Sequence, residues 1–418
     1  MKTNRRMKSI DLFAGCGGLM DGFEQSGKYE TLAAVEWEKA PCRNLRIRLK
    51  DKWKYENADR IVMQFDIQRT EELFKGWHND EEYGESDGLD KLVEEGGGID
   101  VIIGGPPCQA YSIAGRVRDE HGMKNDYRNY LFESYLKVVE RYCPKLFVFE
   151  NVPGILSAQP GDRPIIKIIQ ERFLETGYYV LSDLKNAVID FTDYGVPQNR
   201  KRVIIIGFSM DFFGRETCEE MAKRFYGVYL PKYKSGKKVT VKEAIGDLPK
   251  LFPIGHDEKY EGKRISHSLP EPFVANHVAR WQSERDMDIF RLLTEDIEAG
   301  RNEYVSIEAL KELYTQKTGK TSNVHKYHVI RWDEPSNLIP AHLYKDGLRH
   351  IHPDSLQRRS ITVREAARLQ TFDDDYIFDG SNVEVYKMIG NAVPPGFARK
   401  LAEAVSDLLT DYEREQDE

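Results

Sequence analysis

The first half of the chain alternates short apolar runs with helical stretches, and this alternation limits the possible folds most strongly. Five runs have the length and composition of buried strands: residues 9–13, 31–36, 99–103, 146–150 and 202–208. Strands separated by helices form parallel sheets with crossover connections. The sequence therefore predicts an α/β fold of the Rossmann-like kind, with a doubly wound and mostly parallel sheet.

The alternation ends after residue 208. Residues 209–357 are rich in Tyr, His, Lys and Arg, with a helical pattern at 285–298, and further helices are predicted at 364–369 and 396–409. We predict a larger domain formed by residues 1–208 and 388–418, with an acidic insertion at about 71–98. A smaller inserted domain would cover 209–387, and its variable part about 209–357.

Composition narrows the class of protein. The chain has 418 residues, of which 40% are hydrophobic, and no apolar run approaches the length of about 20 residues that spans a bilayer. The charged start of the chain has no signal-peptide core after it, so we expect a cytoplasmic protein without a membrane partner. Five cysteines without Cys-x-x-Cys spacing predict reduced thiols and no metal site.

The formal net charge of -8 is unevenly distributed. Residues 71–95 carry a net charge of -8 and residues 403–418 carry -6, which leaves +6 on the rest of the chain. We interpret the first segment as a solvated inserted loop and the second as a frayed tail. Five lysines between 232 and 242, including Lys237 and Lys238, suit a phosphate backbone, and a solvated lysine face is equally consistent with them.

The motif Gly104-Gly105-Pro106-Pro107-Cys108-Gln109 follows the predicted strand at 99–103. The two prolines restrict the backbone, so Cys108 has a defined direction on a turn at the edge of the sheet. Open α/β sheets bind ligands at that edge. An isolated Pro-Cys is more often a small buried cysteine, and only the other motifs favour a nucleophile here.

A glycine-rich turn, Asp11-Leu12-Phe13-Ala14-Gly15-Cys16-Gly17-Gly18, joins the first predicted strand to a helix. Glycines allow close approach of a ligand, and an acid at the end of the second strand, Glu36, can bind ribose hydroxyls. Trp37 adds a flat surface for an adenine, and Asp66 with Ile67 supplies a further acid for its amino group. These features predict a nucleoside ligand, although an ordinary strand-to-helix turn would also use the glycines.

Charged residues lie at the end of one later strand and at the start of another. Glu150 leaves an apolar strand, where a carboxyl group can share or donate a proton, although an acid there can also simply cap a helix. Arg202 starts the strand at 202–208, where a guanidinium needs a partner or a ligand.

The order of these motifs resembles that of the DNA (cytosine-5)-methyltransferases. The matching residues are the turn at 11–18, Glu36-Trp37, Pro107-Cys108-Gln109, Glu150-Asn151-Val152, Gln198-x-Arg200-x-Arg202, the segment 364–372, and Gly390-Asn391-x-Val393. The resemblance covers about residues 9–208 and 359–409. The region between them is where this family carries target recognition.

The resemblance implies an enzyme that transfers a methyl group from S-adenosylmethionine to carbon 5 of a cytosine flipped out of double-stranded DNA, releasing S-adenosylhomocysteine. Cys108 would attack carbon 6, with Glu150 and Arg202 on ring position 3 and the carbonyl. The implied cofactor contacts are Phe13, Ala14, Gly15, Gly17, Gly18, Glu36, Trp37, Asp66, Ile67, Pro107, Leu131 and Asn391. The implied DNA contacts are Gln109, Ser112, Arg116, Arg200, Lys237 and Lys238.

The resemblance also implies a bacterial or phage enzyme, the modification half of a restriction-modification system, acting near the nucleoid as a monomer beside a separate restriction endonuclease. Alternatives are a tRNA cytosine-5 methyltransferase and a non-catalytic DNA-binding paralogue. The first has a small recognition region, unlike residues 209–357, and the second has no need for Cys108, Glu150 and Arg202 together. Base-reading candidates are Arg331, Asn337, His342, Lys345, Arg349 and His350.

Overall fold

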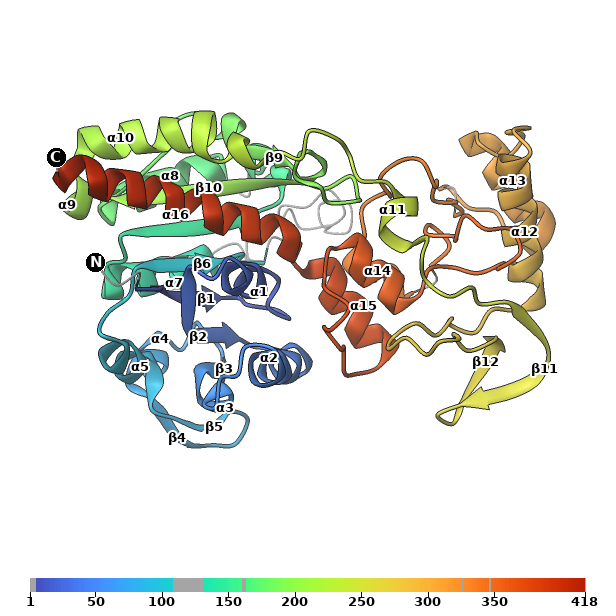
Figure 1. The fold of residues 1–418 in the computed structure, drawn as a ribbon, viewed down its shortest axis with the longest axis horizontal. Coiled ribbons are helices and arrows are strands. Elements are labelled where there is room, and N and C mark those ends of the chain that lie inside the picture. The colour runs from blue at the N-terminus through green and yellow to red at the C-terminus, as the bar shows by residue number, and fades with distance from the viewer. Residues whose placement is uncertain (1–4, 108–130, 160–162, 325, 346, 418) are drawn as a thin grey trace. The chain divides into compact units, whose positions relative to one another are not determined.

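The computed structural model describes residues 5–107, 131–159, 163–324, 326–345 and 347–417. The chain divides into two compact units (Figure 1). Unit 1 contains Met1–Gly195, Arg200–Gly236 and Ala392–Glu418, and unit 2 contains Val196–Asn199 and Lys237–Asn391. Residues 209–236, which the sequence analysis assigned to the smaller domain, fold with unit 1, because α9 (Met210–Phe213) and α10 (Arg215–Arg224) continue directly from its last long strand.

Unit 1 is built on one sheet with the strand order β3-β2-β1-β6-β7-β10-β8, with β9 paired to β10. The strands are β1 (Met7–Leu12), β2 (Tyr29–Glu36), β3 (Val62–Gln64), β6 (Val101–Gly104), β7 (Leu146–Asn151), β8 (Tyr178–Val180), β9 (Val188–Asp190) and β10 (Lys201–Ser209). The first five are parallel, and β10 is antiparallel to its neighbours. The predicted α/β class and all five predicted strands are confirmed, each end within two residues.

Helices cover both faces of this sheet (Figure 1). Besides α9 and α10 they are α1 (Gly18–Gln25), α2 (Lys39–Asp51), α3 (Ala58–Ile61), α4 (Thr70–Lys75), α5 (Gly88–Gly96), α7 (Leu131–Tyr142), α8 (Ile165–Glu175) and α16 (Pro395–Asp417). The C-terminal helix α16 packs against α1, and so returns the end of the chain to its beginning. Both ends of the chain therefore belong to unit 1.

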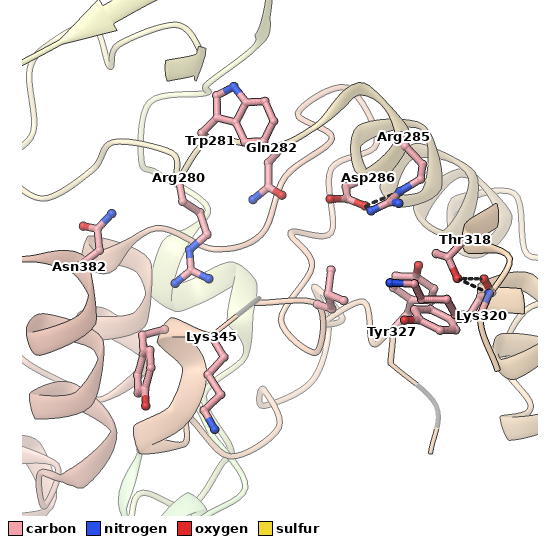
Figure 2. A pocket seen from close by; sticks show the side chains of 13 residues that line it. Arg280, Trp281, Gln282, Arg285, Asp286, Thr318, Lys320, Tyr327, Lys345 and Asn382 are labelled. Carbon is pink, nitrogen blue, oxygen red and sulfur yellow. Dashed lines mark hydrogen bonds and ion pairs between the residues drawn. The ribbon is translucent and has the colours of Figure 1, made fainter. Parts of the chain in front are cut away.

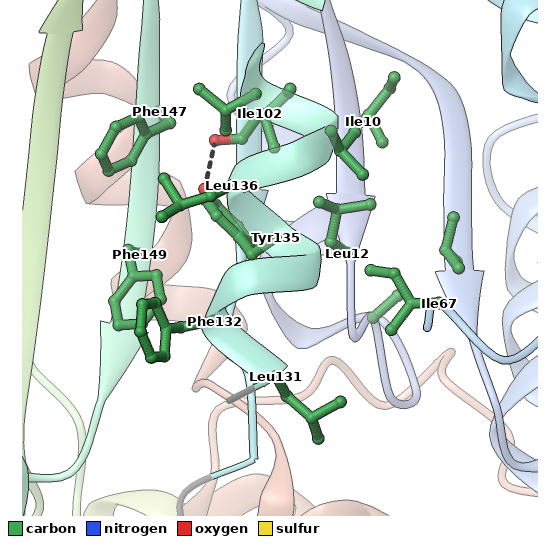
Figure 3. Packing of buried hydrophobic residues seen from close by; sticks show 14 of the residues in the cluster. Ile10, Leu12, Ile67, Ile102, Leu131, Phe132, Tyr135, Leu136, Phe147 and Phe149 are labelled. Atoms are coloured by element: carbon green, nitrogen blue, oxygen red, sulfur yellow. Dashed lines mark hydrogen bonds between the residues drawn. The ribbon is translucent and has the colours of Figure 1, made fainter. Parts of the chain in front are cut away.

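The core between α7 and the sheet is apolar and close-packed (Figure 3). Leu136 of α7 and the facing side chains Ile10, Ile102 and Phe147 are completely buried. The hydroxyl group of Tyr135, also buried, donates to the backbone carbonyls of Ile102 and Val148, 3.2 and 3.0 Å away. Close packing of this kind holds the strand ends, and therefore the loops that follow them, in fixed positions.

The two acidic segments are folded, which corrects the expectation of a solvated loop and a frayed tail. The insertion contains α4, the hairpin β4 (Trp77–Asp80) and β5 (Gly84–Ser86), and α5, with Phe74, Trp77 and Leu89 buried. The acidic C-terminal residues belong to α16, where Glu415 pairs with Arg224 at 3.0 Å. Apolar residues between the acids pack into the core, and the net charge of these segments does not reveal them.

Unit 2 has little sheet. It contains α11 (Val241–Ile245), β11 (Pro253–Tyr260), β12 (Lys263–His267), α12 (Glu284–Glu298), α13 (Ile307–Thr318), α14 (Val363–Leu369) and α15 (Asn382–Asn391). The helices predicted at 285–298 and 364–369 are confirmed. The pair α12 and α13 has its own apolar core, with Phe290, Leu293 and Leu313 at its centre. In the described part of the chain, no helix has the length and apolar character of a membrane-spanning segment.

Candidate active site

The carboxyl ends of the parallel strands meet at one edge of the sheet in unit 1. Strands β1, β2, β3, β6 and β7 end at Leu12, Glu36, Gln64, Gly104 and Asn151. The order in which the chain adds strands reverses between β1 and β6, which are parallel neighbours in the sheet although β2 to β5 lie between them in sequence. Such a switch point opens a crevice at the strand ends, where doubly wound folds bind their ligands.

The glycine-rich turn after β1 has an unusual backbone. Phe13, Gly15 and Gly17 all have positive φ values, of 58°, 55° and 82°. A side chain at Gly18 would meet the backbone oxygen of Val393 at 2.1 Å, so this glycine allows α1 to pack against the chain leading into α16. At Gly15, by contrast, no atom lies within 4 Å of where a Cβ would be. The turn therefore presents open backbone to a ligand.

Glu36 lies beside this turn, at the end of β2. One carboxylate oxygen accepts from the backbone N–H of Gly15 at 2.8 Å, and the other accepts from that of Glu38 at 2.7 Å. Burial raises the pKa of Glu36, and these backbone donors act in the opposite direction. The carboxylate is thus held in one orientation, which suits an acceptor for two neighbouring hydroxyl groups.

Trp37 and Asp66 lie on the same edge of the sheet. The Trp37 side chain is 52% exposed although it adjoins a buried strand, so its indole face is available for stacking. Asp66 follows β3, and its carboxylate accepts from the backbone N–H of Gln68 at 3.0 Å. Ile67 beside it is buried. The acceptor pair, the aromatic face and the open glycine backbone together fit an adenine nucleoside.

The second group of charged residues lies at the end of β7. Arg202 Nε is 2.9 Å from Glu150 Oε1, and both side chains are only 12% exposed. Antiparallel pairing of β10 with β7 explains this contact, because it brings the beginning of β10 to the end of β7. The charge-assisted contact fixes the orientation of both side chains at the end of β7.

The turn Gly105-Pro106-Pro107 contacts Glu150 and its neighbour Asn151. A Cβ at Gly105 would meet Glu150 Oε2 at 2.8 Å, so a larger residue there would displace the carboxylate from its present position. Asn151 Nδ2 donates to the carbonyl of Pro106 at 3.3 Å. The sequence analysis gave neither Gly105 nor Asn151 a role, and only their positions beside catalytic candidates could have suggested one.

The remaining predicted site residues lie in different surroundings. Cys108, Gln109, Ser112 and Arg116 lie outside the described residues, whereas Pro107 is exposed at the end of the turn. Ala14 is buried in the glycine-rich turn, Leu131 is buried at the start of α7, and Asn391 ends α15 in unit 2.

Arg200 was predicted to contact DNA, but its side chain is 2% exposed and donates to the carbonyl of Ala392 at 2.9 Å. Burial lowers its pKa well below the usual value. Its contacts indicate a structural function in unit 1.

The lysine cluster is partly neutralised. Lys232 pairs with Asp407 at 2.6 Å, Lys234 with Asp193 at 3.1 Å, and Lys237 with Glu243 at 2.6 Å. Lys238 is exposed. Ion pairing reduces the charge that the cluster can offer to phosphates.

Two of the six base-reading candidates are engaged within unit 2. His350 is 2% exposed and contacts the carbonyl of Leu338 at 3.1 Å, and burial lowers its pKa to about 3. The Asn337 amide donates to the carbonyl of Arg349 at 3.0 Å. We therefore do not retain His350 as a base-reading residue.

Unit 2 contains a cleft of about 540 Å³ that the sequence analysis did not predict. Four cations, Arg280, Arg285, Lys320 and Lys345, line it together with Asp286, three tyrosines and Trp281. In the view of Figure 2, Arg280 and Lys345 lie on one side and Arg285, Lys320 and Tyr327 on the other. These residues are scattered over more than 60 positions, so no local spacing could reveal the cleft.

Comparison with known proteins decides the family. The family model of the C-5 cytosine-specific DNA methylases matches residues 7–407. The chain belongs to this family. A protein named Type II methyltransferase M.Bpa9945I, from Bacillus paralicheniformis, is 34% identical over 96% of this chain and 99% of its own length. Type II methyltransferase M.DdeI, from Desulfomicrobium norvegicum, is 32% identical over 96% of this chain and 88% of its own length.

Solved structures agree at the level of the fold. A candidate DNA modification methyltransferase encoded within an E. coli prophage has a TM-score of 0.60 at 23% identity, covering 97% of this chain and 99% of that one. Membership of the methylase family confirms the enzyme class predicted from the sequence, a DNA (cytosine-5-)-methyltransferase.

Proposed function

We propose that this enzyme methylates carbon 5 of a cytosine within a specific double-stranded DNA sequence, as the modification component of a restriction-modification system. The observation that supports the reaction is the Glu150–Arg202 pair, held at 2.9 Å on the same sheet edge as the Pro106-Pro107 turn and the Glu36 site. The type II methyltransferases that resemble the chain over nearly their full length support the biological setting.

Cytosine carbon 5 is unreactive until a nucleophile adds to carbon 6. In the proposed mechanism the Cys108 thiolate forms a bond to carbon 6, and the ring electrons move toward nitrogen 3, where the Glu150 carboxyl group supplies a proton. Arg202 fixes Glu150 and donates to the ring carbonyl. After carbon 5 has been methylated, the proton on nitrogen 3 returns to Glu150. A base then removes the carbon 5 proton and the sulfur–carbon bond breaks, which regenerates the thiolate.

S-adenosylmethionine supplies the methyl group when it is bound. Glu36 would accept hydrogen bonds from its two ribose hydroxyls, since both carboxylate oxygens are already oriented by backbone donors. The open backbone at Gly15 leaves room for the nucleoside, and the exposed Trp37 face would stack on the adenine. Asp66 would accept from the adenine amino group.

The target base must leave the duplex, because a stacked cytosine offers no path for attack at carbon 6. Glu150 and Arg202 are 12% exposed, as expected for groups that enclose an extruded base and exclude bulk water. Bisulfite sequencing of a plasmid recovered from cells that express this chain tests the function directly. Protected cytosines at one recurring sequence are expected, and complete conversion would reject the proposal.

The cofactor assignment gives a separate expected result. Glu36→Ala removes the ribose acceptor and Trp37→Ala removes the adenine surface, so each variant should bind S-adenosylhomocysteine about tenfold more weakly. Isothermal titration calorimetry measures this affinity without turnover. Glu38→Ala is the matched control, because its backbone N–H, which contacts Glu36, is kept. Unchanged affinity in both test variants would place the nucleoside elsewhere.

We propose that unit 2 recognises the DNA and that its cleft contacts the phosphate backbone. Lys320 and Lys345 are exposed and form no ion pair with any described residue. Arg280 is held over the ring of Tyr386 at 4.5 Å and donates to the carbonyl of Leu343. The Gln282 amide already donates to Ser360 at 3.0 Å. The cleft therefore offers mainly cationic side chains, with Arg285 paired to Asp286 at 3.0 Å and one further amide at Asn382, and this composition suits phosphates better than base edges.

Replacing Arg285, Lys320 and Lys345 together with glutamine should weaken binding to target and scrambled duplexes alike. Each lost phosphate contact lowers affinity about fivefold to tenfold near 0.1 M salt and makes the salt dependence shallower. Fluorescence anisotropy at several salt concentrations measures both quantities. The set of methylated sites should not change.

The matched control replaces Arg291 of α12 and Lys317 of α13, which are exposed and do not line the cleft. Lys237→Ala with Lys238→Ala should have a smaller effect than the cleft variant, because Lys237 already pairs with Glu243. Relaxed specificity at one base position would show instead that the cleft reads bases.

A further inference from the structure

The acidic insertion between β3 and β6 lies next to the predicted adenine end of the cofactor site. We infer that it is a clamp that positions Glu36 and Asp66 for the nucleoside, an inference that rests on the proposed use of S-adenosylmethionine. The clamp consists of α4, the β4–β5 hairpin and α5. Two aromatic rings of its hairpin, Trp77 and Tyr83, and the guanidinium of Arg69 surround one side chain, Phe65.

Phe65 lies between the two acids that would contact the cofactor. Its backbone N–H donates to the carbonyl of Glu36 at 3.0 Å, and Asp66 is the next residue. The strand that carries them, β3, has three residues and pairs only with β2, at the edge of the sheet. So short an edge strand has few hydrogen bonds of its own, and side-chain packing must hold the loop after it.

The hairpin supplies this packing. The Trp77 ring stacks on Phe65 with a centroid separation of 3.8 Å and an interplanar angle of 18°, and both rings are nearly completely buried. Tyr83 meets the edge of Phe65 at 5.1 Å, and Trp77 Nε1 donates to the Tyr83 carbonyl at 3.2 Å. Phe65 is therefore enclosed on two sides by residues of the insertion.

Arg69 contacts both Phe65 and the hairpin. Its guanidinium lies 4.8 Å from the centre of the Phe65 ring and 2.6 Å from Asp80 of the hairpin. The Arg69 backbone N–H also donates to the carbonyl of Asp66 at 3.0 Å. One residue thus links the hairpin, the aromatic stack and the cofactor-side acid.

The other end of the insertion is anchored to α7. Arg141 Nε lies 2.6 Å from Asp90 of α5, and the hydroxyl of Tyr142 donates to the same carboxylate at 2.8 Å. Phe74 of α4 meets the Tyr142 ring edge to face at 5.7 Å. Because α7 packs on the central strands, these contacts fix the clamp relative to the sheet. The clamp in turn fixes the position of Phe65.

The test is calorimetric titration of S-adenosylhomocysteine into the full-length protein. Trp77→Leu removes the stacked ring and should raise Kd about tenfold, because the acids lose the orientation that the nucleoside requires. Trp77→Phe keeps a ring against Phe65 and should bind within about twofold of the wild type. His78→Ala, exposed on the same strand, is the matched control and should leave Kd unchanged.

Steady-state kinetics separates positioning from general stability. In the Trp77→Leu variant, KM for S-adenosylmethionine should rise while kcat and the Kd for duplex DNA remain within about twofold of wild-type values. Arg69→Gln, which leaves the hydrophobic stack in place, should shift KM in the same direction. Unchanged cofactor affinity in both variants, or an equal loss of DNA binding, would overturn the clamp. Failure of the wild type to bind S-adenosylhomocysteine would instead reject the proposed function.

Discussion

Cys108→Ser should abolish measurable methyl transfer, with a loss of about four orders of magnitude or more in kcat. In the proposed mechanism the Cys108 thiolate attacks carbon 6, whereas a serine hydroxyl at this position would stay protonated near neutral pH. Transfer of tritiated methyl groups to a plasmid measures the loss. The variant should still bind S-adenosylhomocysteine with wild-type affinity, because the contacts at Glu36 and Gly15 are unchanged.

A covalent trap distinguishes nucleophilic attack from simple positioning by Cys108. Duplex DNA containing 5-fluorocytosine cannot lose its carbon 5 substituent as a proton, so the wild-type enzyme should form an adduct that survives denaturing electrophoresis. Cys108→Ser should form none. Cys143→Ser is the matched control, since Cys143 is an exposed cysteine of the same unit. Turnover by the Cys108 variant at more than one hundredth of the wild-type rate would contradict the assignment.

The sequence predicted the parts of the fold that depend on local patterns. Strands buried on both faces are continuous apolar runs, so the parallel strands β1, β2, β6 and β7 and the antiparallel strand β10 were found to within two residues. Strand β3 was missed because it has only three residues, and the insertion was interpreted as a loop because acids dominate it. Its buried residues, Phe74, Trp77 and Leu89, are too far apart to form a clear periodic pattern.

The candidate site was predictable for a related reason. Glu36 and Glu150 each occur at the end of an apolar run, and parallel strands bring such ends to one edge of a sheet. The partner of Glu150 was not predictable from spacing, because its contact with Arg202 depends on the antiparallel return of β10. The burial of Arg200 and His350 is likewise a tertiary effect, which the charge of a residue does not reveal.

Family membership also bears on the alternatives. The tRNA methyltransferase has less support, because the matched family is that of DNA methylases, and named type II methyltransferases align with 96% of this chain, including unit 2. In a non-catalytic paralogue the largely buried Glu150–Arg202 pair would need a structural explanation. Removing one member of such a pair leaves the other charge without its partner, so its presence requires either a structural or a catalytic explanation.

The function of that pair leads to the second large expected effect. Glu150→Gln keeps the size of the side chain but removes the carboxyl proton, and should lower kcat by about two to four orders of magnitude. Arg202→Ala removes the proposed donor to the ring carbonyl and should lower kcat by about two to three orders of magnitude. If both residues act on one cytosine ring, the double variant should lose little more than the worse single variant, because each depends on the other.

Single-turnover rates at saturating DNA and S-adenosylmethionine measure these effects, and thermal unfolding controls for folding. Glu133→Gln is the matched control, because Glu133 pairs with Arg172 at 3.1 Å in the same unit and is not among the predicted site residues. It should leave the rate unchanged. Additive losses in the double variant would mean that Glu150 and Arg202 act at separate steps. Single variants within about twofold of the wild-type rate would reduce the pair to a structural contact between β7 and β10, and the site of chemistry would have to be sought elsewhere on this sheet.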